Sequence, residues 1–143
     1  MSTHNSYIFK FKDLNKIESI LDWFKENCKG FNPVEKEEIS EELIFKKQPE
    51  DFDKHPFTLI IKYGKEFYNV ELKSWFNELS EAMTSKEFLD IFFDFCEKLK
   101  PYVAFIGIEN KPGRILWKDN KKTDIEGPNF MELNQPDDIK FLE

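Results

Sequence analysis

The segment that most constrains the fold is residues 84–109, with the sequence TSKEFLDIFFDFCEKLKPYVAFIGIE. It is typical of a helix that is ended by a proline and followed by an apolar strand. Thr84 and Glu87 predict a capping box at the start of the helix, because each side chain can bond a backbone amide at the other's position. Pro101 predicts the end of the helix, since proline has no amide hydrogen and restricts the residue before it.

About half the circumference of this predicted helix is apolar. A face that wide needs broad cover, and a β-sheet is the usual cover. In the segment that follows, residues 102–108, both alternating sets of side chains are apolar, which predicts an interior strand covered on both faces. The apolar helix positions are Phe88, Phe92, Phe95, Cys96 and Leu99, with Leu89, Ile91 and Phe93 beside them.

A strand and a second helix are predicted near the N-terminus. Residues 7–11 alternate, with Tyr7, Phe9 and Phe11 on one face. Asp13 is expected to cap the helix that follows, and Gly30 is expected to end it. The apolar positions of this helix follow i, i+3, i+4 spacing: Leu14, Ile17, Leu21, Phe24 and Cys28, flanked by Ile20 and Trp23.

Residues 57–63 and 66–72 predict a β-hairpin with a defined register. Gly64 and Lys65 suit a two-residue type II′ turn. That turn sorts the apolar side chains onto one face, whereas a slip of one residue would destroy the sorting. The expected apolar pairs are Ile61 with Tyr68, Leu59 with Val70, and Phe57 with Leu72.

The remaining elements complete an α+β order, β-α-β-β-β-α-β-β, over a single domain of residues 1–143. We expect a mostly antiparallel sheet of about five to six strands, with two main helices packed on one face. Residues 119–143 are expected to form an irregular, acidic C-terminal wrap or tail. The shorter predicted elements are a strand at 43–47, a loop at 48–56, a short helix within 73–83, a turn at 110–113 and a strand at 114–117 paired with residues 103–109.

Composition favours a folded cytoplasmic protein. The chain has 143 residues, of which 40% are hydrophobic and 16% aromatic. It contains no run of the ~20 apolar residues that a membrane span needs, and its start lacks the pattern of a signal peptide. Cys28 and Cys96 both fall on predicted apolar helix faces, so buried, reduced thiols are expected.

The net charge of −7 disfavours a partner that is a nucleic acid, and the negative charge is uneven. Residues 35–53 hold eight acids against three lysines, a net of −5. Residues 119–143 hold seven acids against three lysines, a net of −4. The rest of the chain is therefore about +2, so two segments carry the acidity.

The sequence predicts no enzyme, and no catalytic, cofactor or metal site. His55 has carboxylates nearby in the sequence, but their spacing matches no ligand pattern. Neither cysteine has a histidine beside it to activate the thiol. The glycines are too few for a phosphate-binding loop. Asp90 and Asp94 are expected on the solvated face of their helix.

The acidic segment 35–53 is the one candidate for function. It is either a solvated loop that aids solubility or a docking surface for a basic partner. A small, acidic α+β protein without catalytic residues resembles bacterial toxin-neutralising immunity proteins as a class. That resemblance implies a basic protein partner such as a toxin. No nucleic-acid or membrane partner is expected, and the chain is expected to be a monomer or weak homodimer. The expected partner-binding residues are Glu37, Glu38, Glu41, Glu42, Asp51 and Asp53.

Two alternatives remain open. The first is a small-ligand-binding or enzymatic domain with an aromatic pocket between the sheet and the helix. Its expected lining is Tyr63, Tyr68, Trp75 and Phe92. The second is an oligomeric module that pairs through an edge strand such as residues 43–47.

Overall fold

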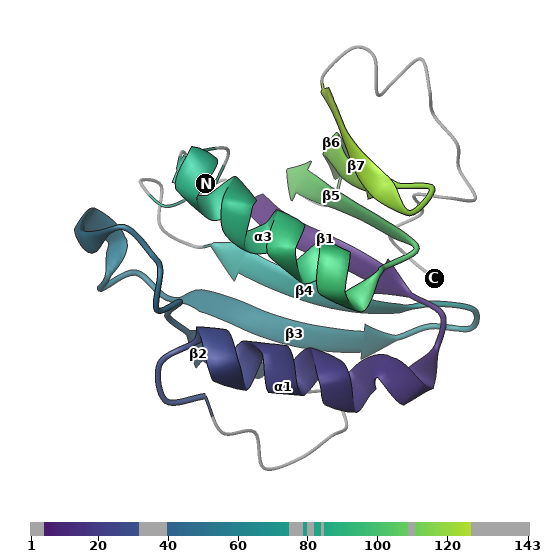
Figure 1. Cartoon of the computed structure of the whole chain (residues 1–143), viewed down its shortest axis with the longest axis horizontal. Coiled ribbons are helices and arrows are strands. Elements are labelled where there is room, and N and C mark those ends of the chain that lie inside the picture. Colours follow the sequence, from purple (N-terminus) through teal and green to yellow (C-terminus); the bar gives the residue numbers. More distant parts are fainter. Residues whose placement is uncertain are drawn as a thin grey trace.

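A computed structural model describes residues 5–31, 40–74, 79, 82–83, 85–108 and 111–126. These residues form one antiparallel sheet in the order β2-β3-β4-β1-β5-β6-β7, and helices α1 and α3 cover one face of it (Figure 1). The α+β prediction is confirmed. The strands are β1 (Asn5–Phe11), β2 (Ser40–Leu43), β3 (Phe57–Tyr63), β4 (Tyr68–Ser74), β5 (Val103–Ile108), β6 (Lys111–Lys118) and β7 (Lys121–Glu126). The helices are α1 (Ile17–Asn27) and α3 (Lys86–Leu99), with the 3₁₀ turns η1 (Leu14–Lys16) and η2 (Glu50–Phe52).

The predicted first strand is the centre of the sheet. β1 lies between β4 and β5 and pairs with both in antiparallel fashion. Its alternation is as expected: Tyr7, Phe9 and Phe11 point into the core beneath the helices. The interior position of β5 is confirmed too, because Val103 and Phe105 pack with Ile8 and Ile115 in a second buried cluster.

Helix α3 is the predicted aromatic helix, with a different start. Its N-cap is Ser85, whose side chain makes no capping hydrogen bond, so the predicted capping box from Thr84 to Glu87 is wrong in position. Thr84 itself lies outside the described residues. The helix ends at Leu99, and Lys100 takes a left-handed conformation with φ 53° before Pro101. The buried apolar stripe is as predicted: Phe88, Phe92, Phe95, Cys96 and Leu99.

Helix α1 is confirmed, but its first turn was misread. Asp13 caps η1 rather than α1, through a 2.9 Å bond from the backbone amide of Asn15. A 3₁₀ turn has 3.0 residues per turn instead of 3.6, which moves Leu14 off the apolar stripe and leaves it 61% exposed. At the other end of α1, Cys28 is extended and forms an isolated antiparallel β-bridge with Phe45. Gly30 follows with φ 67°.

The register predicted for the hairpin is wrong by two residues. In the structure Tyr63 faces Tyr68, and a four-residue loop is closed by a 2.8 Å bond from the Gly64 amide to the Phe67 carbonyl. A two-residue shift keeps every side chain on its own face, so the apolar pattern could not distinguish the two registers. Phe67 leaves the ladder and its ring contacts Tyr102 at 5.0 Å. The observed apolar pairs are Ile61 with Val70 and Leu59 with Leu72.

Three other boundaries differ from the prediction. The edge strand is β2, at 40–43 instead of 43–47, because Phe45 turns into the core. Lys73 and Ser74 belong to β4, so the helix expected within 73–83 cannot begin there, and most of that segment lies outside the described residues. β6 begins at Lys111, inside the turn expected at 110–113.

A seventh strand occupies part of the segment that was expected to be irregular. β7 pairs with β6 across Asp119 and Asn120, which both have positive φ, 55° and 61°. That is the signature of a type I′ hairpin turn, which matches the twist of the strands it joins. Residues 127–143, the rest of the predicted C-terminal wrap, lie outside the described residues.

Candidate functional site

A groove lies between α1 and α3 on the outer side of the helix layer, with a volume of about 480 Å³. We call it the α1–α3 groove. Trp23 and Asn27 of α1 form one side, and Phe45 and Lys47 contribute from the segment after β2. The lining residues from α3 are Glu87, Asp90, Ile91, Asp94 and Lys98.

Trp23 and Asp94 connect the two helices across this groove. The Trp23 Nε1–H donates to Asp94 Oδ2 at 3.1 Å, and the same carboxylate oxygen lies 3.3 Å from Lys98 Nζ. On α1, the Asn27 side-chain amide donates to the Trp23 carbonyl at 2.8 Å. The indole is 4% exposed, so its hydrogen bond satisfies a donor that water reaches poorly. The distance between the helices is therefore set by specific contacts.

Three carboxylates line the α3 side of the groove in a row. Glu87, Asp90 and Asp94 are spaced i, i+3 and i+7, which places them along one face of the helix. Lys86 pairs with Asp90 at 2.6 Å, and that hydrogen bond raises the pKa of Lys86. Exposed pairs of this i, i+4 kind hold their side chains weakly, so these carboxylates are available to other cations.

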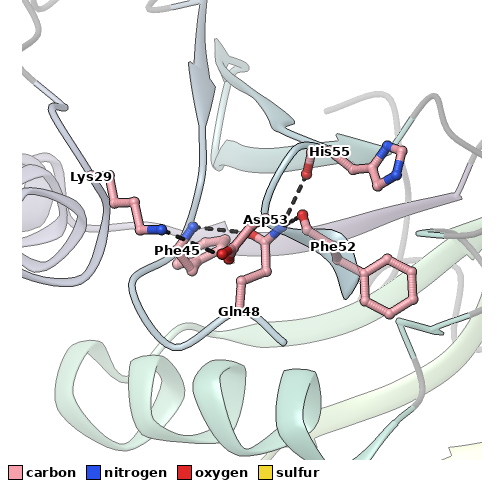
Figure 2. A network of polar contacts seen from close by, with 6 residues as sticks. All are labelled: Lys29, Phe45, Gln48, Phe52, Asp53 and His55. Carbon is pink, nitrogen blue, oxygen red and sulfur yellow. Dashed lines mark hydrogen bonds and ion pairs between the residues drawn. The ribbon is translucent and has the colours of Figure 1, made fainter. Parts of the chain in front are cut away.

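Gln48 fixes the loop that leads from the groove to η2 (Figure 2). Its Oε1 accepts from the Phe45 backbone amide at 2.9 Å. Its Nε2 donates to the carbonyl oxygens of Phe52 and His55, at 2.5 and 3.0 Å. An ion pair between Lys29 and Asp53, at 3.7 Å, joins the same loop to the end of α1. One buried amide thus organises residues 45–55.

Aromatic rings of the loop at residues 45–55 pack against both helices. The Phe52 ring of η2 lies 6.1 Å from Phe88 in the first turn of α3. Phe45 lies 6.0 Å from Trp23 and 5.3 Å from Phe92. The acidic 3₁₀ turn, Glu50–Phe52, therefore sits beside the start of α3, where the row of carboxylates also begins.

The six residues predicted to bind a partner do not form one cluster in the described structure. Glu37 and Glu38 lie outside the described residues. Glu41 and Glu42 are adjacent on the edge strand β2, so their side chains point to opposite faces of the sheet. Asp51 is exposed in η2, and Asp53 is half-buried next to Lys29. None of the four described residues lines the α1–α3 groove, but Asp51 belongs to η2, which packs against the start of α3 through Phe52.

Glu87, Asp90 and Asp94 were missed as candidate residues. The sequence placed Asp90 and Asp94 on a solvated helix face, and they are indeed exposed, with side-chain exposures of 59% and 43%. What the sequence could not show is that α1 lies alongside and turns this face into the wall of a groove. The i, i+3, i+7 acidic spacing was the available signal.

The two thiols are not suited to act as nucleophiles. Cys28 and Cys96 are free and buried. Burial raises the pKa of Cys28 to about 12, and burial also raises the pKa of Cys96. Since the thiolate is the reactive form, both groups remain in the inert, protonated state near neutral pH.

The side chains named for an aromatic pocket lie elsewhere. Phe92 is fully buried, with its ring 3.9 Å from that of Tyr7, and Tyr68 is 2% exposed. Tyr63 is exposed on the hairpin, and Trp75 lies outside the described residues. None of the described three lines the α1–α3 groove.

The described part of the chain contains no group of three or more histidine, cysteine or acidic side chains placed to hold a metal ion. None of the helices described is long and apolar enough to cross a membrane. Comparison of the chain with protein-family models, with curated proteins and with solved structures gives no match.

Proposed function

We propose that this chain is a non-enzymatic protein-binding domain that docks a basic partner on its helix-covered side. One observation carries the proposal: carboxylates from two distant segments lie on the same side of the molecule, in the acidic turn η2 that packs against the start of α3 and along the α3 wall of the groove. Asp51 and Asp53 come from the loop that Gln48 fixes, and Glu87, Asp90 and Asp94 come from α3. A groove with carboxylates on its rim and an apolar floor is the kind of surface that basic, partly apolar partners fit.

Charge and rigidity both favour association with such a partner. The net charge of −7 steers cationic proteins toward the chain and raises the rate of encounter. The bonds from Gln48 and the Phe52–Phe88 contact hold the acidic loop in one shape before binding. A surface that is already ordered loses less conformational entropy when a partner docks.

In its most concrete form, the proposal is a small acidic immunity or inhibitor-type protein of a bacterium that neutralises a basic toxin by occluding its surface. The class resemblance and the acidic balance support this form. The free, buried thiols are in keeping with a cytoplasmic location, where cysteines stay reduced.

The test is binding to a basic, nuclease-type protein encoded beside this chain in its genome. We expect the two proteins to coelute in gel filtration and the affinity to fall as salt rises. The triple variant Asp51→Lys, Glu87→Lys, Asp90→Lys should weaken binding about 100-fold in calorimetry, because reversed charges meet a surface of the same sign.

The matched control is Glu66→Lys combined with Glu97→Lys. Glu66 lies in the β3–β4 loop and Glu97 is an exposed α3 residue that does not line the groove. These changes should leave the affinity within about threefold. A partner that binds the triple variant as tightly as the parent chain would contradict the helix-side surface.

A second set of variants addresses the acidic segment before the hairpin. Glu37, Glu38, Glu41 and Glu42 are changed to lysine together. If this set abolishes binding while the triple variant does not, the docking surface is the acidic segment of residues 37–42 and the α1–α3 groove is excluded.

A small-ligand-binding domain is the second candidate. The volume of the groove, about 480 Å³, falls within the range of small-molecule pockets. Native mass spectrometry of the purified chain that shows a retained small molecule, lost in the triple variant, would favour this reading over protein docking.

A further inference from the structure

We infer that the α1–α3 groove receives an arginine side chain of the partner. The inference rests on the proposed function and names the group that the groove recognises. It combines three properties of the groove: a rigid apolar floor, a row of carboxylates, and lysines that pair with that row only through exposed i, i+4 contacts.

The floor consists of side chains that are nearly fully buried and therefore fixed. Phe45 is 1% exposed, Trp23 is 4% exposed and Ile91 is 8% exposed. Only their edges reach the groove. The three-carbon stem of an arginine can lie along such edges and lose its apolar surface from water, while its charged head remains at the rim.

The wall favours a guanidinium over an ammonium. Neighbouring carboxylates in an i, i+3 and i+4 row lie ~5–6 Å apart at Cβ. A planar guanidinium has five donors and can bond two such groups at once, whereas the lysine ammonium is a compact, strongly hydrated point charge. We assign the guanidinium to Glu87 and Asp90. The third carboxylate, Asp94, already accepts a hydrogen bond from Trp23 of α1, and a ligand there would have to break it.

The lysines around the groove do not block this occupant. Lys86 and Lys98 hold Asp90 and Asp94 by i, i+4 pairs, and their side chains are 85% and 62% exposed. Lys47 lines the groove and is exposed as well. Each has a flexible stem that can turn to solvent, and exposed pairs of this kind contribute little free energy. A partner arginine that also buries its stem gains more than they lose.

The test is an NMR titration of the intact chain with the peptide acetyl-Gly-Arg-Gly-amide. The reporter is the Trp23 indole N–H, which lies in the groove and bonds Asp94. Its signal is assigned by its loss in Trp23→Phe. We expect saturable shifts of this signal with a dissociation constant on the order of millimolar, as suits one side chain.

The control peptides replace arginine with citrulline, which has the same shape without the charge, or with lysine. We expect at least about tenfold weaker binding for both. The double variant Glu87→Gln, Asp90→Asn should remove the shift, and Glu97→Gln, on the same helix outside the groove, should retain it.

Three outcomes would overturn the inference: no shift of the Trp23 signal, equal shifts with citrulline, or equal binding of lysine and arginine. The proposed function fails separately. If the chain binds a basic protein through its acidic surface but does not bind the arginine peptide, only the inference of an arginine in the groove is refuted. A chain that binds the peptide but no basic protein refutes the proposed partner alone.

Discussion

At the scale of single residues, the loop at 45–55 depends on Gln48. This side chain is 5% exposed and bonds the backbones of Phe45, Phe52 and His55. A buried amide that satisfies three backbone groups stabilises one loop conformation over all others, because each group would be costly to leave without a partner. Because Gln48 bonds the carbonyl of Phe52, it also positions the acidic residues of η2.

We predict that Gln48→Ala lowers the free energy of unfolding by about 2–4 kcal/mol, since it removes three hydrogen bonds to backbone groups, of which the Phe52 carbonyl keeps a bond from the His55 amide. Urea denaturation followed by far-UV circular dichroism measures the change. Lys47→Ala, at the exposed neighbouring position, should stay within about 0.5 kcal/mol. Equal stability of the two variants would show that the bonds of Gln48 are not needed.

Neither Gln48 nor the Trp23–Asp94 bond could be predicted from the sequence. Gln48 appeared only as the first residue of a loop, and Trp23 and Asp94 are 71 positions apart. Such contacts depend on which helix faces lie together, and a residue pattern along one element contains no information about its neighbour. The burial of Phe88, Phe92 and Phe95, in contrast, follows from periodicity within a single helix.

At the scale of elements, predictability followed the strength of the apolar pattern. The helices and the apolar strands were found because their periods of 3.6 and 2 are long and regular. β7 was missed because, in the sequence KKTDIE, Ile125 is the sole apolar residue. The hairpin register was missed because a period of two cannot reveal a shift of two. The extra information lay in Phe67, which packs against Tyr102 instead of extending the ladder.

The C-terminal end of α3 offers an element-scale prediction. Lys100 holds φ 53° and ψ 63°, a conformation that costs a non-glycine residue about 1 kcal/mol. Lys100→Gly should therefore raise the free energy of unfolding by about 0.5 kcal/mol, after loss of the contact between Lys100 Nζ and the Trp117 ring.

Lys98→Gly is the control, because Lys98 lies within the helix. It should lower the free energy of unfolding by about 1 kcal/mol, from the cost of glycine at a helical position together with loss of the pair with Asp94. Thermal and urea denaturation of both variants measure the difference in sign. Destabilisation of the same size in both would show that the left-handed residue is not strained.

At the scale of the whole molecule, burial makes the fold sensitive to alkali. Burial raises the pKa of Cys28 from 9.0 to about 12 and also raises the pKa of Cys96, Tyr7 and Tyr68. A group whose pKa is higher in the folded state stabilises fully below its unfolded pKa and loses that contribution as pH rises toward the folded value.

We predict that stability falls steadily above pH 9, with the thiols first and the two tyrosines above pH 10. At a pH between its unfolded and folded pKa values, each such group is deprotonated only in the unfolded state. It then lowers the free energy of unfolding by about 1.4 kcal/mol for each further pH unit. Urea denaturation at pH 8, 9.5 and 10.5 measures it. Cys28→Ala should make the slope shallower between pH 9 and 12, and a stability that is constant to pH 11 would contradict the burial of these groups.

The central place of β1 has a consequence for the order of folding. Three strands lie on each side of it, and among the described strands no ladder other than those of β1 joins β2–β3–β4 to β5–β6–β7. Both three-stranded halves are built from antiparallel neighbours that follow one another in the chain, so they can form by closing short loops. Residues 5–11 precede both partner strands in the chain, and the second partner, β5, ends only at Ile108. The two ladders of β1 are therefore the contacts of longest sequence separation in the sheet, and they are the ones that join its two halves.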